Sequence, residues 1–265
     1  MTHRISSPLN ARETALLEAI GIRPNGYRVL LRRPLTVALG RRAYLPGVVV
    51  ALLTFAVSYR HGDPSVPAAA IAAVVITLSL AAHEGGHLLL GRHAKGVTPR
   101  MIVLRSTGGV SVLEGRYDTA RGAALFAAGG PLATAIFTTV LVLGGLQLSG
   151  PLRTALLLPA VLNALLLGAN LLPLAPMDGY MLFRSAVWAE VGSRAEAERR
   201  AMDWSRALLG WAACCSLVVL DRNTGYGLLA LFLVGTFALQ HHAAASRRPP
   251  SALPAHRPPR GLPRR

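Results

Sequence analysis

Two histidines and a glutamate stand inside a long apolar run, in His83-Glu84-Gly85-Gly86-His87. On a helix, residues four apart lie one turn apart on the same face, so the imidazoles of His83 and His87 can meet at one metal ion. Glu84 lies beside the first histidine, where its carboxylate can reach a water on the metal without being a ligand. The spacing predicts a metal site with three protein ligands and an open fourth position, with Glu84 as general base.

The surroundings of this motif strengthen the metal interpretation. Glu84 is the only acidic residue between Ser65 and Lys95, in a segment long and apolar enough to cross a bilayer. An ionisable side chain at membrane depth is costly unless it is paired, binds a metal or faces water. Gly85 and Gly86 each cost about 1 kcal/mol of helix propensity relative to alanine. Close approach of another backbone, or room for a substrate, would explain them.

The preferred third ligand is Asp178, the only acidic residue between Thr119 and Trp188. It follows Pro173 and Pro176, which end a helix and leave irregular backbone at membrane depth. Such backbone is tolerated only where it is buried in protein or lines a wet cavity. An ordinary Asp-Gly turn with Gly179 is the alternative interpretation of this aspartate.

Two other residues compete for the third position. His93 follows His87 at the ligand spacing of soluble metzincin proteases, although Leu90 stands where that pattern has glycine. Glu190 would be the ligand in a membrane metalloprotease that takes a glutamate from a later helix.

The two motifs together, His83-Glu84-Gly85-Gly86-His87 and Asn170-x-x-Pro173-x-x-x-x-Asp178-Gly179, resemble the site-2 protease family of intramembrane zinc metalloproteases. Gly129-Gly130-Pro131 resembles a further family feature, with Thr134 where many members have asparagine. The resemblance implies one zinc ion per chain, bound by His83, His87 and Asp178. It also implies that Glu84 is the general base and that Asn170 holds the substrate or polarises its carbonyl.

The elements that must position these residues are apolar helices. Of 265 residues, 52% are hydrophobic and 15% charged, which is unlike a soluble domain. We expect an all-α polytopic membrane protein with about six transmembrane helices, or four and a re-entrant pair. The expected spans are Ala43 to Tyr59, Pro67 to Leu90, Gly122 to Leu148, Leu152 to Leu172, Ala207 to Leu220 and Tyr226 to Gln240.

The net charge is +16, and the basic residues lie mostly in the segments that flank the expected spans. With six spans, 25 of the 28 Lys and Arg residues lie on one side, and Arg60, Arg153 and Arg222 lie on the other. This asymmetry predicts that both termini and the metal site face the cytoplasm, in a membrane that the arginine-rich composition suggests is bacterial. Spread in this way, the basic residues do not indicate a nucleic-acid partner.

The remaining segments complete the predicted organisation. Two β-branched runs, Arg100 to Arg105 and Gly109 to Glu114, flank a turn and predict a small membrane-associated β-hairpin. A substrate segment could add to its edge as a strand, which the family resemblance also implies. Residues 1–42 are expected to form a cytoplasmic segment with an amphipathic helix over Leu9 to Ile20. Residues 43–240 form the transmembrane domain with a catalytic core at 67–179, and 241–265 form a disordered basic tail.

The leading functional hypothesis is an endopeptidase that cuts a peptide bond within or next to a membrane span. Its partners would be the bilayer and a single-span membrane protein or membrane-associated peptide. A metal-ion transporter is a second hypothesis, which predicts polar relay groups at several depths. A catalytically silent protein that binds membrane partners is a third, against which the intact Glu84 argues.

Overall fold

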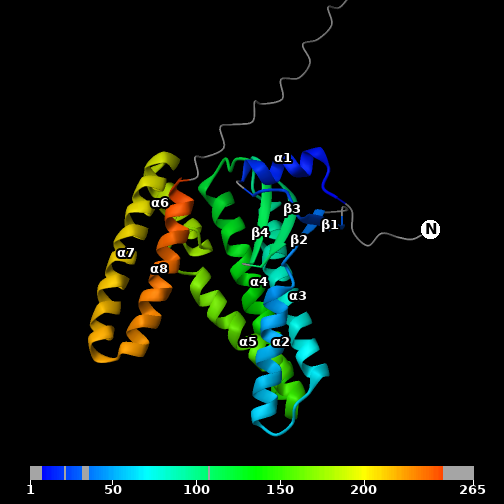
Figure 1. Ribbon diagram of the computed structural model, residues 1–265. Coiled ribbons are helices and arrows are strands. Elements are labelled where there is room, and N and C mark those ends of the chain that lie inside the picture. Colours follow the sequence, from blue (N-terminus) through cyan, green and yellow to red (C-terminus); the bar gives the residue numbers. More distant parts are fainter. Residues whose placement is uncertain (1–7, 21, 32–35, 107, 247–265) are drawn as a thin grey trace, which may run out of the picture.

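The computed structural model describes residues 8–20, 22–31, 36–106 and 108–246. A bundle of helices carries a small sheet and a short helix at one end, and a pair of long helices stands beside it (Figure 1). The helices are α1 (Ala11–Ala19), α2 (Leu45–Arg60), α3 (Val66–Gly91), α4 (Ala120–Leu146), α5 (Gly150–Asn170), α6 (Asp178–Val191), α7 (Arg194–Arg222) and α8 (Thr224–Ser246). The strands are β1 (Tyr27–Leu31), β2 (Thr36–Gly40), β3 (Val97–Arg105) and β4 (Gly108–Gly115).

Several helices begin at residues that cap their free amide groups. The side chain of Ser65 accepts a hydrogen bond from the Ala68 amide at the start of α3. Thr119 does the same for α4, and Ser193 for α7. In α1, Asn10 and Glu13 form a reciprocal capping box. A helix is therefore present at the predicted place, slightly shorter than expected.

In the part of the chain that the structure describes, four helices are long and apolar enough to cross a membrane, namely α3, α4, α5 and α7. The apolar part of α8 and all of α2 are shorter. At 1.5 Å per residue the 16 residues of α2 reach about 24 Å, less than the ~30 Å hydrocarbon core. Helices thus occur at all six predicted places, while the six crossings remain a prediction.

The sheet is larger than the predicted hairpin. Strands β3 and β4 pair antiparallel as expected, and β2 pairs parallel with β3, which gives the order β1-β2-β3-β4. The first two strands come from the N-terminal segment, in which we predicted only a helix. Strand β4 is an edge of this sheet, with no further strand beside it in the described part of the chain.

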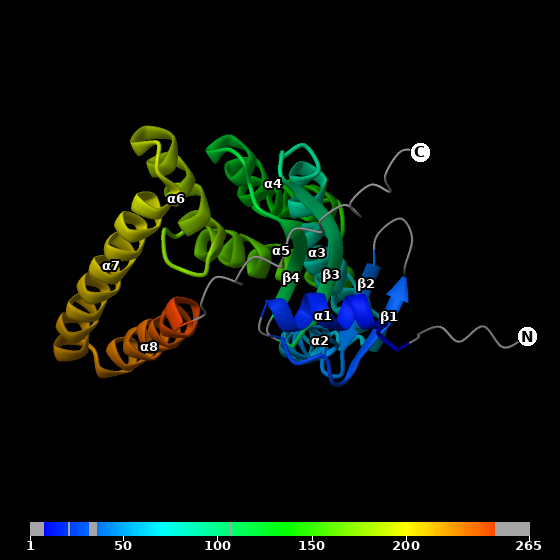
Figure 2. The same cartoon turned by 90° about the horizontal axis from the view of Figure 1, so that it is seen from above.

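The two faces of the sheet have separate cores. Met101 and Val103 pack with Leu17 of α1 on one face. Ile102 and Leu104, which alternate with them, pack with Phe126 of α4 on the other. Seen from above, α1 lies across the strands (Figure 2). The sheet is thereby held between α1 and the bundle ends that carry the predicted metal ligands.

The pair α7 and α8 is joined to the bundle through α6. Helix α7 packs on α6 and α8, and α6 packs on α4. The hydroxyl of Tyr180 and the guanidinium of Arg184, both on α6, donate to Glu198 of α7 at 2.7 and 2.8 Å. Burial, together with the bond to Glu198, raises the pKa of Tyr180 above its ordinary value, so the phenol stays a donor.

Candidate metal centre

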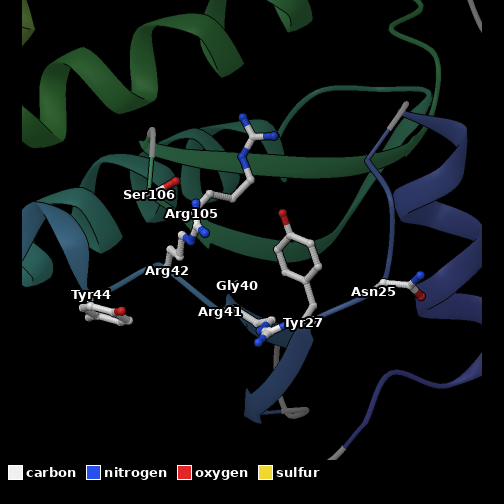
Figure 3. Close-up of a pocket in the computed structure, with 9 residues that line it drawn as sticks. Asn25, Tyr27, Gly40, Arg41, Arg42, Tyr44, Arg105 and Ser106 are labelled. Carbon is white, nitrogen blue, oxygen red and sulfur yellow. The ribbon is translucent and has the colours of Figure 1, made fainter.

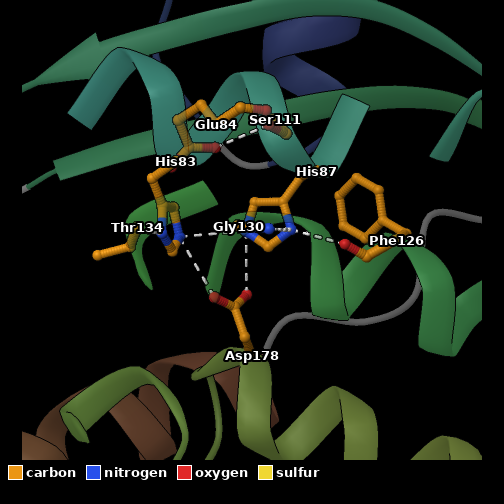
Figure 4. Close-up of polar contacts among 8 residues, drawn as sticks. All are labelled: His83, Glu84, His87, Ser111, Phe126, Gly130, Thr134 and Asp178. Atoms are coloured by element: carbon orange, nitrogen blue, oxygen red, sulfur yellow. Dashed lines mark hydrogen bonds and ion pairs between the residues drawn. The ribbon is translucent and has the colours of Figure 1, made fainter. Parts of the chain in front are cut away.

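Three of the predicted site residues meet at one point (Figure 4). His83 and His87 lie on α3 with their Nε2 atoms 3.2 Å apart, and both are buried, at 7% and 4% exposure. Asp178, the first residue of α6, places Oδ2 at 3.3 Å from Nε2 of His83 and Oδ1 at 3.2 Å from Nε2 of His87. One ligand atom from each residue lies within 4.8 Å of the others. Two strands and two helices, β3, β4, α4 and α5, separate the two histidines from Asp178 along the chain. The fold brings the three side chains together.

The other ring nitrogens determine which atoms are free to bind a cation. Nδ1 of His87 lies 2.7 Å from the carbonyl oxygen of Phe126, which can only accept, so Nδ1 carries the proton. The Gly130 amide lies 3.2 Å from the same nitrogen, a longer contact that cannot be a hydrogen bond while Nδ1 is protonated. Nδ1 of His83 lies 2.8 Å from Oγ1 of Thr134, which can accept in the same way. Both Nε2 lone pairs then point towards Asp178.

This donor set fits a divalent cation. Two nitrogen lone pairs and a carboxylate at about 3 Å from one another repel unless a proton or a cation lies among them. Two neutral imidazoles and one carboxylate are a ligand combination of catalytic zinc sites. Partners on Nδ1 are also the usual means of orienting a metal-binding histidine.

Glycines make the room for this cluster. A Cβ atom at Gly130 would collide with Nε2 of His87 and would lie 2.7 Å from Nε2 of His83. Pro131 follows it inside α4, where its missing amide leaves the carbonyl of Ala127, four residues earlier, without its helical donor. Gly130 therefore leaves space for the imidazoles.

The adjacent glycines of the first motif have different surroundings. A Cβ atom at Gly86 would collide with the carbonyl oxygen of Gly129, and one at Gly129 with that of Gly86. Helices α3 and α4 thus approach backbone to backbone, as small residues permit. Gly85 has open space within 4 Å of the Cβ position. Close approach of another backbone explains Gly86, whereas room for a substrate at Gly85 remains a prediction.

Glu84 lies beside the cluster and contacts the sheet. It is 6% exposed, and Oγ of Ser111 on β4 lies 2.8 Å from Oε2 and 2.9 Å from the Glu84 backbone oxygen. A Cβ atom at Gly109 would lie 2.5 Å from Oε1. Gly109 and Ser111 are two residues apart on β4, so they lie on the same face of the strand, towards α3. The edge strand therefore contacts the Glu84 carboxylate directly. Glu84 is not part of the three-ligand group.

The competing ligands lie elsewhere. His93 is exposed, and its Nε2 accepts a hydrogen bond from Arg92 at 3.2 Å. Glu190 is exposed near the end of α6. Asn170 is half-buried at the end of α5, and the irregular segment 171–177 connects it to Asp178. Asn170 is therefore near Asp178 in the chain, and its proposed contact with substrate remains a prediction.

Three supporting groups were not predicted as such from the sequence. The Phe126 carbonyl is a backbone group, for which no side-chain pattern gives a signal. Ser111 has a weak signal, since it alternates with Gly109 on one face of a predicted strand. Thr134 was noted only as a departure from the family pattern, and the structure places its hydroxyl on His83.

A further polar contact links α3 and α5, about one helical turn before His83. The hydroxyl of Ser79 on α3 donates to the amide oxygen of Asn163 on α5 at 2.8 Å, and both side chains are buried. Such bonds between apolar helices contribute about 0.6–2 kcal/mol each.

Comparison with known proteins supports the metalloprotease interpretation. No protein-family model matches the chain. A protein of Mycobacterium tuberculosis named "Putative zinc metalloprotease Rip3" is 33% identical over 130 residues, which are 47% of this chain and 33% of that protein. A Synechocystis protein named "Putative zinc metalloprotease sll0528" is 29% identical over 181 residues, 67% of this chain and 47% of that protein. The chain thus matches a third to about half of the length of these relatives.

One solved structure aligns with most of the chain. The site-2 protease from Methanocaldococcus jannaschii aligns with a TM-score of 0.49 and 18% identity, over 84% of this chain and 96% of that chain. The similarity to two proteins named zinc metalloproteases, together with the group His83, His87 and Asp178, agrees with the resemblance to the site-2 protease family.

Proposed function

We propose that this chain is an intramembrane zinc endopeptidase of the site-2 protease type, which hydrolyses a peptide bond within or next to a membrane span of its substrate. The observation that carries the proposal is the meeting of His83, His87 and Asp178 between helices long and apolar enough to cross a membrane. A transporter would need further relay groups, and in the described part of the chain this is the one such group of three.

The three ligands would hold the zinc ion through Nε2 of each histidine and the Asp178 carboxylate. When bound, zinc supplies Lewis acidity, which lowers the pKa of a water and polarises a carbonyl. The chain contributes a fixed ligand arrangement, because Thr134 and Phe126 orient the imidazoles. Apolar helices around the site limit the access of bulk water, which strengthens electrostatic interactions inside it.

Glu84 is proposed to move the proton. Its carboxylate accepts a hydrogen bond from Ser111 on Oε2, which leaves Oε1 able to accept a proton from the attacking water. The same carboxylic acid then donates the proton to the leaving amine, so the carboxylate is regenerated and no net proton is consumed.

The edge strand β4 is proposed to bind the substrate. A helical peptide has its backbone amides satisfied internally, so a transmembrane segment must unwind before its carbonyl reaches the site. Addition of the unwound segment to β4 would satisfy its backbone groups. The bond from Ser111 to Glu84 supports this path, because it places the edge strand next to the proposed base. Asn170 is proposed to hold the substrate carbonyl from the end of α5.

The first test compares the purified wild type with Glu84→Gln. We expect the variant to retain zinc and to lose about a hundredfold or more of its cleavage rate on single-span substrates, because glutamine cannot exchange the proton. Zinc is measured by atomic emission and cleavage by gel mobility. Equal cleavage by both proteins, or loss of zinc from the variant, would contradict the role of Glu84.

The second test separates the candidate ligands. Asp178→Ala should lower the zinc content of the purified protein strongly, whereas Glu190→Ala should leave it unchanged, because only Asp178 reaches the two histidines. His93→Ala serves as a second control. Zinc that survives in Asp178→Ala and disappears from Glu190→Ala would show that the assignment is wrong.

A further inference from the structure

A cavity of about 470 Å³ lies away from the metal centre, where the sheet meets the start of α2 (Figure 3). Polar and basic residues from three places in the sequence line it. They are Asn25, Gly26, Tyr27, Gly40, Arg41, Arg42, Tyr44, Arg105 and Ser106. Neither the metal site nor the proposed cleavage uses any of these residues.

Two glycines shape this cavity. Tyr27 on β1 pairs with Gly40 on β2, and a Cβ atom at Gly40 would lie 3.2 Å from the Tyr27 ring. Gly26 has φ +89°, a conformation that favours glycine, and the aliphatic part of Arg41 lies against it. The tyrosine ring and the arginine stem are therefore positioned by close contact with backbone.

The charge in the cavity is positive and uncompensated. Arg41, Arg42 and Arg105 line it, and no acidic residue does. In the described ranges none of the three forms an ion pair, and Nε of Arg105 is buried without a hydrogen-bond partner. Planar guanidinium groups bind phosphate oxygens in a bidentate manner, and tyrosine, serine and asparagine side chains add neutral donors.

The position of the cavity favours a ligand at the membrane surface. Helix α2 begins at Leu45, directly after the lining residues, and exposes apolar side chains such as Val49 and Leu52. Tyr44 at its start is 61% exposed, as expected for an aromatic residue at a membrane–water interface.

We propose that this cavity binds the phosphate group of an anionic glycerophospholipid, with the acyl chains lying along α2. Three arginines without acidic partners supply the charge, and the adjoining apolar helix supplies the surface for the chains. The proposal stands independently of the proposed proteolytic activity, and its test measures binding alone.

The experiment titrates the full chain in neutral detergent with short-chain phosphatidylglycerol and follows binding by calorimetry. Short-chain phosphatidylcholine and glycerol 1-phosphate are titrated in parallel. We expect phosphatidylglycerol to bind the wild type at least tenfold more tightly than either of the other two. The triple variant Arg41→Gln, Arg42→Gln, Arg105→Gln should lose at least tenfold in this affinity.

The matched control removes the same charge from exposed positions outside the cavity, in Arg23→Gln, Arg28→Gln, Arg121→Gln. It should bind phosphatidylglycerol like the wild type. Equal loss in both triple variants would show general attraction of anionic lipid and overturn the proposal. Equal affinity for glycerol 1-phosphate would overturn the lipid assignment. If the first triple variant does not purify, exposed Arg42→Gln alone should lose at least threefold, and no loss would overturn the proposal.

Discussion

At the scale of residues, the proposed chemistry depends on groups that orient the ligands as much as on the ligands. His83 and His87 each offer Nε2 because Nδ1 is occupied, in one case by a hydroxyl and in the other by a carbonyl. The sequence predicted that these three residues meet because ionisable side chains are scarce in apolar segments. It could not predict the Phe126 carbonyl, because the backbone of every residue offers the same group.

Thr134 gives a prediction at this scale. Thr134→Val keeps the shape and removes the acceptor for the His83 ring, so we expect zinc affinity to fall by about 10–100-fold. Competition with a chelating dye measures this without any activity assay. Thr134→Ser should retain the affinity. Thr138→Val is a matched control, because the Thr138 hydroxyl is buried in the same helix without a hydrogen-bond partner. Equal affinity in Thr134→Val and wild type would contradict the orienting role.

At the scale of elements, the apolar runs predicted the places of the long helices, and two β-branched runs around a turn predicted β3 and β4. Strands β1 and β2 were missed because β2 pairs with β3, which is distant in sequence, as in the pair Ala38 and Val103. Parallel pairing of distant segments leaves no local pattern. Helix α6, which carries Asp178, lies between the fourth and fifth expected spans, where we predicted no helix.

The contact between α3 and α4 gives a prediction at this scale. Gly86→Ala would force its methyl group against the Gly129 carbonyl, so we expect a loss of about 1–3 kcal/mol in stability. Gly85→Ala meets open space and should gain up to about 1 kcal/mol from helix propensity. Thermal unfolding midpoints in one detergent compare the two. If both variants shift the midpoint in the same direction and to the same extent, the close approach is not what limits stability.

At the scale of the whole molecule, a wide apolar surface and an asymmetric charge distribution define how the chain would lie in a membrane. Large apolar side chains are exposed along α2, α4, α5, α7 and α8. The basic residues predicted on one side include Lys95, close to the end of α3 that carries the metal ligands. Those ligands would then lie just inside the cytoplasmic edge of the hydrocarbon.

Topology is the prediction at this scale. In a Cys214→Ala, Cys215→Ala background, Lys95→Cys should react with an impermeant maleimide only after the cytoplasmic face is opened. His61→Cys, in the turn between α2 and α3, should react in intact cells. Both positions are exposed, so accessibility does not differ for structural reasons. The reverse labelling pattern would invert the orientation and place the metal centre at the outer face.

The position of Asp178 at the first residue of α6 has a further consequence. Helix α6 packs on α4 and carries α7, which in turn carries α8, whereas the two histidines belong to α3. An ion held by all three ligands would link α3 to α6, and so would join the part of the chain that includes α3 to the part that includes α6, α7 and α8. The free energy of binding the ion and the free energy of docking α6 onto α4, beside the histidines, are then thermodynamically linked. Strain that separates the two parts should weaken the ion's hold, and the ion should resist that separation.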